Sequence, residues 1–284
     1  MDVLPERIVI IGGGRMGAGI AQAFLVAGAH VAVVEAGGAA AEAARRRVAE
    51  GLEETALRGK LDAPVDTLLD RLELLDSVDQ VHPGTGLVVE AVPERADLKA
   101  AVLRAAESAV GIDAVLATNT SSLSVTELAA ALDRPARFLG LHFFNPVPAS
   151  KLVEVVVAAD TDPALVTTAS AWVRLLGKTD VVVKDSPGFA SSRLGVLLGL
   201  EAIRMLEEGV ADAGAIDAAM ELGYRHPMGP LRSTDLVGLD VRLAIAEHLH
   251  RTLGGRFTPP QLLRDKVAAG ELGRKTGRGF YTYD

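Results

Sequence analysis

One short unit near the start of the chain limits the possible folds more than any other feature. Residues 7–35, RIVIIGGGRMGAGIAQAFLVAGAHVAVVE, read as a strand, a glycine-rich turn, a helix and a second strand. Gly12, Gly14 and Gly17 occupy the three glycine positions of the pattern G-x-G-x-x-G. The first glycine allows a tight turn, the second lets the backbone approach a pyrophosphate, and the third permits close helix–strand packing. The unit therefore predicts a βαβ fold that binds a dinucleotide, with a purely structural glycine turn as the alternative.

The residues around this loop indicate which dinucleotide is bound. The helix that begins near Arg15 directs its free N–H groups at the phosphates, and we expect Met16 in the same loop to contact the cofactor. Glu35, at the end of the second strand, can accept hydrogen bonds from ribose hydroxyls and would repel a 2′-phosphate. Residues 36–38, AGG, offer no arginine to such a phosphate. NAD is therefore favoured over NADP, while FAD stays open on the fingerprint alone because flavoproteins use the same turn.

Short β-branched runs alternate with longer helical patterns through the first part of the chain. The predicted strands are 7–12, 31–35, 86–92, 114–119, 137–144, 152–157 and 180–183. Near-continuous apolar strands separated by helices are typical of a mostly parallel sheet with both faces covered. The predicted fold class is thus α/β, a Rossmann-type NAD-binding domain with a mostly parallel sheet, followed by an all-α C-terminal domain.

The pattern that predicts the second domain starts after Lys184. Residues 188–209 predict a long buried helix with Gly209 as its C-cap, and further helical patterns cover about 212–222, 234–251 and 259–270, with a strand signal only at 279–283. The segment KDSPG at 184–188 fits a domain boundary. We therefore expect an NAD-binding domain over 1–184 and an all-helical domain over 185–284.

Composition excludes several classes of protein. A net charge of −8 argues against broad attraction to nucleic acid or an anionic membrane. The N-terminus lacks the pattern of a signal peptide, and no apolar run approaches the ~20 residues that span a bilayer, so we expect a cytoplasmic protein. With no cysteine and six histidines that lack ligand spacing on a helical face, we expect no metal.

A histidine is the usual acid/base for a nicotinamide enzyme that oxidises an alcohol. By position, surface roles are the default for His30, His82, His248 and His250, which leaves His142 and His226. His142 ends a predicted strand, at the sheet edge where α/β proteins bind ligands. If 137–144 and 152–157 are neighbouring strands, Glu154 can approach the ring, fix its tautomer and stabilise its charged form. From the pattern alone, this catalytic interpretation and a structural His–Glu bridge remain open.

Several motifs together resemble one enzyme family over essentially the whole chain. In order, they are GGGRMGAGIA, VVEAVPE, TNTSSLSV, GLHFFNPVP, KLVEVV, DSPGF, HPMGP, DLVGLD and GRKTGRGFY. Their order and spacing are similar to those of the 3-hydroxyacyl-CoA dehydrogenases, most of all the bacterial 3-hydroxybutyryl-CoA members. The resemblance implies an NAD-dependent oxidoreductase that interconverts (S)-3-hydroxyacyl-CoA and 3-oxoacyl-CoA of short acyl chain. It also implies a homodimer formed through apolar helix faces such as residues 189–208.

The resemblance also implies roles for individual residues. It makes His142 the acid/base and Glu154 its orienting carboxylate, and it places Ser121 and Asn145 against the substrate oxygen, with Asn145 also touching the nicotinamide. Further matched cofactor contacts are Glu94, Lys99 and Lys275, for which solvated charges at helix ends are the alternative.

The chain departs from the family pattern at one matched position and marks the coenzyme A contacts poorly. Where many members have an active-site asparagine in P-G-F-x-x-N-R, this chain has Ser192, which can reach substrate through water. Near the region that contacts coenzyme A, Gly51 has no side chain to donate, whereas Arg58 and Lys60 could meet phosphates. Two alternatives therefore stand: a dehydrogenase for a free hydroxy acid of the gulonate or carnitine type, and a non-catalytic NAD-binding regulatory protein.

Overall fold

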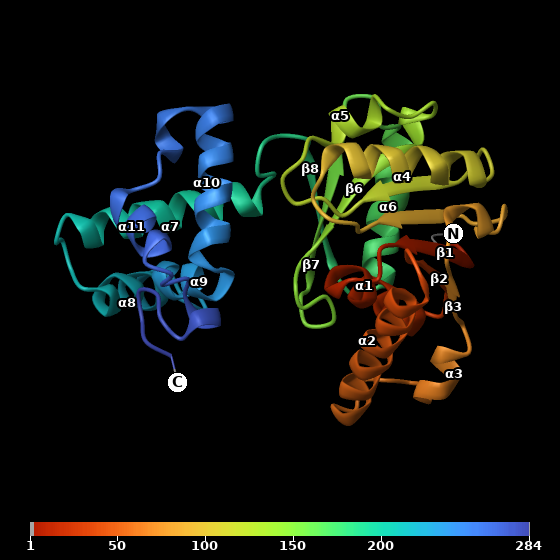
Figure 1. Ribbon diagram of the computed structural model, residues 1–284, viewed down its shortest axis with the longest axis horizontal. Coiled ribbons are helices and arrows are strands. Elements are labelled where there is room, and N and C mark those ends of the chain that lie inside the picture. Colours follow the sequence, from red (N-terminus) through yellow and green to blue (C-terminus); the bar gives the residue numbers. More distant parts are fainter. Residues whose placement is uncertain (1–2, 284) are drawn as a thin grey trace. The chain divides into compact units, whose positions relative to one another are not determined.

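The computed structural model describes residues 3–283 and separates into two compact units. The first unit ends at Ser186 and the second begins at Pro187. The first unit is built around a sheet, and the second is helical (Figure 1). This is the predicted fold class, and the division falls within the KDSPG segment.

The first unit contains an eight-stranded sheet with the order β3-β2-β1-β4-β5-β6-β7-β8. The strands are β1 (Arg7–Ile11), β2 (His30–Val34), β3 (Leu72–Leu75), β4 (Leu87–Glu90), β5 (Val115–Thr118), β6 (Phe138–Phe143), β7 (Leu152–Val157) and β8 (Thr179–Lys184). Every neighbouring pair is parallel except β6 and β7, which are antiparallel. The sheet is therefore mostly parallel, as predicted, but β3 at its edge was not among the predicted strands.

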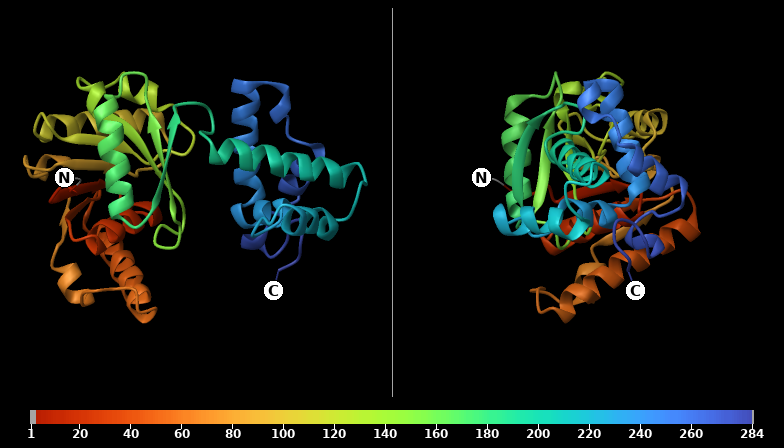
Figure 2. Two further views of the ribbon diagram at one scale, coloured as in Figure 1. Left: turned by 180° about the vertical axis from the view of Figure 1, so that it is seen from behind. Right: turned by 90° about the vertical axis from the view of Figure 1, so that its left-hand side faces the viewer.

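Helices cover the two faces of this sheet. They are α1 (Arg15–Val26), α2 (Gly38–Leu57), α3 (Val65–Leu69), α4 (Ala96–Ala109), α5 (Val125–Ala129) and α6 (Pro163–Leu175), with short 3-10 helices η1 (Val78–Gln80) and η2 (Pro135–Arg137). Side chains of α1, α2 and α6, among them Phe24, Val48 and Trp172, share one buried cluster with Ile8 and Ile10 of β1. Helix α4 lies in front of the sheet in Figure 1 and α6 lies in front of it in the reverse view (Figure 2, left). The two helices thus cover opposite faces.

The second unit consists of α7 (Ser191–Glu207), α8 (Ala213–Gly223), α9 (Pro230–Val237), α10 (Leu239–Leu253) and α11 (Gln261–Ala268), with η3 (Gly255–Phe257) and η4 (Arg274–Thr276). Its core includes Leu200, Ile203, Leu239 and Phe257. The single helix predicted for 234–251 was wrong, because Gly238 adopts a φ of 102° and separates α9 from α10. The strand signal at 279–283 was also wrong: within the described residues this stretch forms only an isolated bridge, between Arg278 and Thr282.

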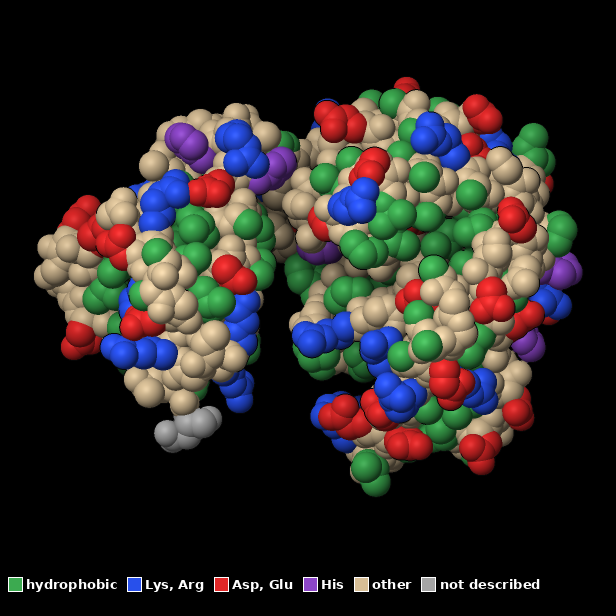
Figure 3. Space-filling view, in the orientation of Figure 1, with side chains coloured by type: hydrophobic (Ala, Val, Ile, Leu, Met, Phe, Trp, Pro, Cys, Tyr) green, Lys and Arg blue, Asp and Glu red, His purple; other side chains and the backbone are tan. Residues whose placement is uncertain are grey.

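Charges on the first unit are mixed in sign. On the face seen in Figure 3, its acidic and basic side chains are interspersed instead of gathered by sign. Within residues 3–283, no helix has both the length and the apolar character that crossing a membrane requires.

Candidate active site

The glycine loop has the geometry that a bound pyrophosphate needs. Gly12 adopts a φ of +97°, and a Cβ there would lie 2.8 Å from the Ala91 carbonyl oxygen. At Gly17 a Cβ would lie only 1.7 Å from the Gly12 carbonyl oxygen, so α1 packs against the turn in a way that only glycine permits. By contrast, nothing lies within 4 Å of a Cβ built on Gly14. The loop therefore has one open backbone position between two crowded ones, which fits a phosphate that approaches at Gly14.

The start of α1 is available to an anion. Gly14 is the N-cap residue in an extended conformation, and within the described chain no side chain caps this helix end. Met16 lies in the first turn and is packed against the core. Glu35 follows β2, and its Oε1 accepts a 2.6 Å hydrogen bond from the Gly13 N–H. The carboxylate is thus fixed beside the loop, where the ribose of a bound dinucleotide is expected.

His142 and Glu154 face each other across β6 and β7. Both side chains are buried, and the antiparallel register places the two residues directly opposite one another. His142 Nδ1 lies 2.8 Å from Glu154 Oε2. His142 is the second-last residue of β6, so the pair lies at the carboxyl end of that strand, on the same edge of the sheet as the glycine loop. The approach expected from the sequence is therefore present, and the ring is held through Nδ1.

Two neighbours help to place this ring. The Phe144 ring lies with its centroid 4.4 Å from that of His142, at an interplanar angle of 49°. Asn119 follows β5, and its Oδ1 accepts a 2.9 Å hydrogen bond from the Phe143 N–H. This contact ties the end of β6 to the end of β5. Sequence reasoning did not identify Asn119, although its position directly after an apolar strand, in TNTSSL, carried the signal.

Glu94 organises the loop that carries Ser121. Glu94 Oε1 accepts hydrogen bonds from Thr120 Oγ1 at 2.6 Å and from the N–H groups of Ser121 at 2.9 Å and Ser122 at 3.0 Å. The Ser121 hydroxyl lies 3.4 Å from the same oxygen, a long contact that lets it turn to another acceptor. Partial burial acts to raise the pKa of Glu94, but the Lys99 ammonium and these hydrogen bonds outweigh it and hold the pKa below its usual value of 4.5. Glu94 thus supports the serine loop as a carboxylate.

Lys99 contradicts one of the two interpretations that the sequence allowed. It is not a solvated charge, because its side chain is almost fully buried. Its Nζ lies 2.7 Å from Glu90 Oε1, 3.1 Å from the Val92 carbonyl oxygen and 3.3 Å from Glu94 Oε2. An ammonium has three N–H donors, and these contacts occupy them. Lys99 thus holds Glu94 in place, and its contact with the cofactor stays a prediction.

Three other predicted residues of the first unit are exposed. Asn145 is exposed just beyond β6, and the Asn145–Pro146 peptide is cis. Arg58 and Lys60 are exposed near the end of α2, where Arg58 forms an ion pair with Glu54.

Two predicted site residues belong to the second unit, and one glycine has a packing role. Ser192 lies in the first turn of α7, and Lys275 Nζ lies 2.6 Å from Asp240 Oδ1. Gly51 packs against α1, where its carbonyl oxygen accepts a 2.7 Å hydrogen bond from Gln22 Nε2. Its lack of a side chain thus serves helix packing.

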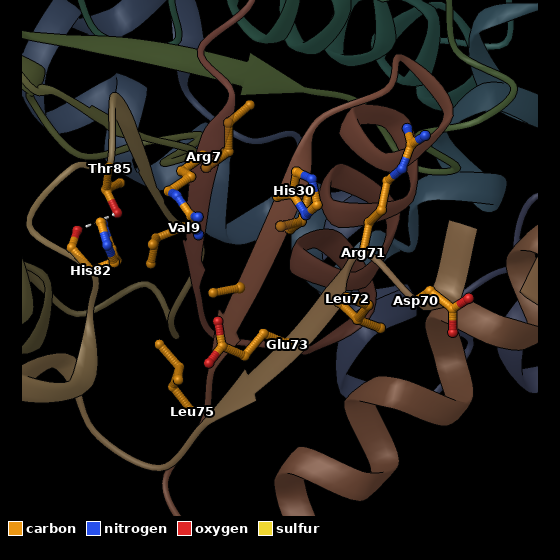
Figure 4. Close-up of a pocket in the computed structure, with 13 residues that line it drawn as sticks. Arg7, Val9, His30, Asp70, Arg71, Leu72, Glu73, Leu75, His82 and Thr85 are labelled. Atoms are coloured by element: carbon orange, nitrogen blue, oxygen red, sulfur yellow. Dashed lines mark hydrogen bonds between the residues drawn. The ribbon is translucent and has the colours of Figure 1, made fainter. Parts of the chain in front are cut away.

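Two other histidines lie at the opposite edge of the sheet. A pocket of about 260 Å³ at the amino ends of β1, β2 and β3 is lined by His30, His82, Arg7 and Glu73 among others (Figure 4). His82 Nδ1 accepts a 2.9 Å hydrogen bond from the Gly84 N–H, which fixes a turn. Neither histidine shares an edge with the glycine loop. Within residues 3–283, no group of three or more potential metal ligands is present.

Comparisons with known proteins agree over nearly the whole chain. Residues 7–186 match the family model "3-hydroxyacyl-CoA dehydrogenase, NAD binding domain", and residues 188–283 match "3-hydroxyacyl-CoA dehydrogenase, C-terminal domain". A probable 3-hydroxybutyryl-CoA dehydrogenase of Bacillus subtilis is 40% identical over 281 residues, with 98% of each chain covered. A 3-hydroxybutyryl-CoA dehydrogenase of Mycobacterium tuberculosis is 41% identical over 286 residues, again with 98% of each covered.

A solved structure agrees with the fold as well. The (S)-3-hydroxybutyryl-CoA dehydrogenase of Ralstonia eutropha superposes with a TM-score of 0.93 at 40% identity, covering 99% of this chain and 100% of that one. The glycine loop, the buried histidine–glutamate pair and the two-domain match lead to the same conclusion. The chain belongs to the 3-hydroxyacyl-CoA dehydrogenase family, with both its NAD-binding and its C-terminal domain.

Proposed function

We propose that this protein is an NAD-dependent dehydrogenase that interconverts (S)-3-hydroxyacyl-CoA and 3-oxoacyl-CoA of short acyl chain. The observation that carries the proposal is the buried pair of His142 and Glu154, 2.8 Å apart at the sheet edge that also holds the glycine loop. The similarity to 3-hydroxybutyryl-CoA dehydrogenases supports the substrate class.

The chemistry divides between the cofactor and the protein. NAD, when bound, supplies the hydride acceptor, and the open backbone at Gly14 with the uncapped start of α1 would hold its pyrophosphate. His142 takes the proton from the substrate hydroxyl in oxidation and returns it in reduction. Because Nδ1 is engaged by Glu154, this proton moves through Nε2.

Each supporting side chain has one task in this scheme. Glu154 fixes the tautomer of His142 and stabilises the imidazolium that forms when the ring takes the proton. Ser121, held by the loop that Glu94 organises, donates its hydroxyl to the substrate oxygen, and Asn145 offers its amide to the same oxygen. The negative charge that develops on this oxygen during reduction is thus stabilised by the neutral donors of Ser121 and Asn145 and by the His142 ring.

The test is a comparison of NADH consumption by the parent protein and by His142→Gln with acetoacetyl-CoA as substrate. General acid–base catalysis contributes roughly 10²- to 10⁴-fold, so we expect kcat to fall at least ~100-fold in the variant. His30→Gln is the matched control, because it changes the same residue type in the same unit at the opposite edge. A His142→Gln enzyme within a few-fold of the parent would contradict the acid/base assignment.

The same assay separates the alternative substrate class. Free hydroxy acids of the gulonate or carnitine type, offered with NAD in place of the coenzyme A thioester, should be turned over far more slowly than (S)-3-hydroxybutyryl-CoA. Faster turnover of a free acid would overturn the thioester assignment. The homodimer and the cytoplasmic location expected from the sequence stay predictions.

A further inference from the structure

A lysine of the first unit bonds to two backbone carbonyls and to no carboxylate. Lys178 lies between α6 and β8, and its Nζ lies 2.6 Å from the carbonyl oxygen of Val147 and 2.6 Å from that of Ser150. Both acceptors belong to residues 144–151, the β6–β7 connection. Burial lowers the pKa of Lys178, and no carboxylate within residues 3–283 counters this effect. Partial burial of a charge without a counter-charge is costly, so this contact calls for a role beyond that of a solvated surface lysine.

The ammonium lies at the same edge of the sheet as the pair of His142 and Glu154. Because β7 is antiparallel to β6 and parallel to β8, β8 begins at the edge where β6 ends. Thr179, the first residue of β8, donates its N–H to the Lys151 carbonyl oxygen at 2.6 Å. Lys178 is therefore placed directly beside the β6–β7 connection.

The β6–β7 connection contains a turn that Lys178 spans. The Pro146 carbonyl oxygen accepts the N–H groups of Ala149 at 3.1 Å and of Ser150 at 2.9 Å. The ammonium bonds to one carbonyl near the start of this turn and to another at its end. A displacement of the turn would break both contacts at once, so Lys178 fixes the turn as a unit.

The same turn is anchored to the helix that follows the glycine loop. Val147 is only 2% exposed, and a Cβ built on Gly19 of α1 would lie 2.9 Å from the Val147 Cβ. The absence of a side chain at Gly19 thus lets Val147 pack closely against α1. The turn is therefore held on two sides, by α1 through Val147 and by the start of β8 through Lys178.

Asn145 depends on this turn for its position. It directly precedes Pro146, and its side chain is exposed. Within residues 3–283 its amide group has no hydrogen bond, so no other side chain orients it. The place of the amide is therefore set by the backbone that carries it, and that backbone continues into the turn that Lys178 fixes.

We propose that Lys178 is a positioning residue, which holds Asn145 at the reacting oxygen of the substrate by fixing the β6–β7 connection. The inference rests on the proposed function, because Asn145 acts within that reaction. A misplacement of about 1 Å in a group that contacts the reacting atoms can slow an enzyme roughly 100-fold. Since the ammonium itself touches neither substrate nor cofactor in this scheme, its loss lowers kcat and leaves NADH affinity unchanged.

The test is a double-mutant cycle with acetoacetyl-CoA and NADH. We expect kcat to fall about tenfold in Lys178→Met and at least as far in Asn145→Ala. The double variant should stay within about twofold of Asn145→Ala, because the lysine then has no amide left to position. Lys178→Arg, which can still donate to both carbonyls, should restore part of the rate. Lys184→Met removes an exposed lysine from the other end of β8 and should leave kcat unchanged.

Three kinetic outcomes would overturn the inference. They are a parent-like kcat in Lys178→Met, a parent-like kcat in Asn145→Ala, and a double variant whose loss equals the product of the two single losses. The third outcome would show that Lys178 acts through some other group. Circular dichroism and NADH titration check that each variant folds and binds cofactor. Should Lys178→Met not fold, Lys178→Gln, which keeps a donor for one of the carbonyls, takes its place in the cycle.

A measurement without substrate keeps this inference separate from the proposed function. Backbone amides of the β6–β7 connection, among them those of Ala149 and Ser150, should exchange hydrogen about tenfold faster in Lys178→Met than in the parent. Lys184→Met should leave these rates unchanged. Unchanged exchange in Lys178→Met would overturn the inference even in an active enzyme, whereas a parent that does not turn over acetoacetyl-CoA would overturn the proposed function.

Discussion

The ammonium of Lys99 lies 2.7 Å from the carboxylate of Glu90, and both side chains are almost completely withdrawn from water. Glu90 ends β4, and its second oxygen accepts a 2.6 Å hydrogen bond from Thr118 Oγ1 at the end of β5. The pair therefore holds α4 against the ends of β4 and β5. It also places the Lys99 charge 3.3 Å from Glu94, which holds the serine loop.

Replacing Lys99 should destabilise the protein strongly. Lys99→Met leaves the Glu90 carboxylate buried without its counter-charge, which typically costs about 3–5 kcal/mol. Urea unfolding followed by circular dichroism measures the loss of free energy of unfolding. Lys60→Met, at an exposed position near the end of α2, is the control and should change it by less than ~0.5 kcal/mol. Equal stability of both variants would refute the structural role given to the buried pair.

Glu94 should make stability depend on pH in acid. Its pKa in the folded protein is lowered below 4.5, so the charged form stabilises the fold. That contribution is complete above the pKa of the unfolded chain and is lost as pH falls through the lower pKa of the folded state. We expect the stability difference between the parent and Glu94→Gln to shrink between about pH 5.5 and pH 3. A difference that stays constant over this range would exclude a depressed pKa at Glu94.

Loss of the charge on Glu154 should slow catalysis while leaving cofactor binding intact. In Glu154→Gln the imidazolium of His142 is no longer stabilised and its tautomer is no longer imposed, so we expect kcat to fall ~100-fold or more. Steady-state rates with acetoacetyl-CoA give kcat, and fluorescence titration with NADH gives the dissociation constant of the cofactor. An unchanged kcat would leave the pair with a structural role only.

Two glycine substitutions should affect cofactor binding and folding separately. Gly14→Ala places its Cβ where nothing lies within 4 Å, so we expect a normal melting temperature but NADH binding weakened tenfold or more, because the methyl group occupies the approach of the phosphate. Gly17→Ala would force a Cβ to within 1.7 Å of the Gly12 carbonyl oxygen and should lower the melting temperature or prevent folding. Thermal melts with and without NADH measure both effects, and tight cofactor binding by Gly14→Ala would argue against the loop geometry.

Glu35 should determine the choice between the two nicotinamide cofactors. The parent is expected to use NADH in strong preference to NADPH, because the carboxylate beside Gly13 repels a 2′-phosphate. Glu35→Ser should lower the ratio of kcat/KM with NADH to kcat/KM with NADPH about tenfold or more. Glu53→Ser, an exposed glutamate on α2, tests whether the total charge alone matters. A parent that turns over NADPH faster would reverse the cofactor assignment.

The features that could be predicted from the sequence are those encoded by local pattern. The glycine loop and the order of the apolar strands follow from short-range periodicity, and the approach of His142 to Glu154 followed from two strands joined by one turn. The edge strand β3 was not predicted because its sequence, LELL, is short and carries a glutamate. The break between α9 and α10 at Gly238 was not predicted because apolar periodicity continues across it. Only the positive φ of the glycine marks the boundary.

What could not be predicted depends on contacts between distant elements. The burial of Lys99 is set by the packing of α4 against β4 and β5, whereas its sequence neighbours are those of an ordinary exposed helix. Arg242 lies on the buried stripe of α10 between Leu239 and Ala246, and the space for its guanidinium there follows from two glycines that α7 presents to it. Burial of a long polar side chain is a property of the partner surface, which a local pattern does not contain.

The cross-strand pairing of His142 with Glu154 also bears on how the chain tolerates insertions and deletions. The distance between the two side chains is set by the register of β6 and β7, and residues 144–151 that connect the strands do not determine it. That connection can grow or shrink, and so reshape the mouth of the site, without separating the ring from the carboxylate. A single residue added within either strand would turn one of the two to the other face of the sheet and leave a buried charge alone.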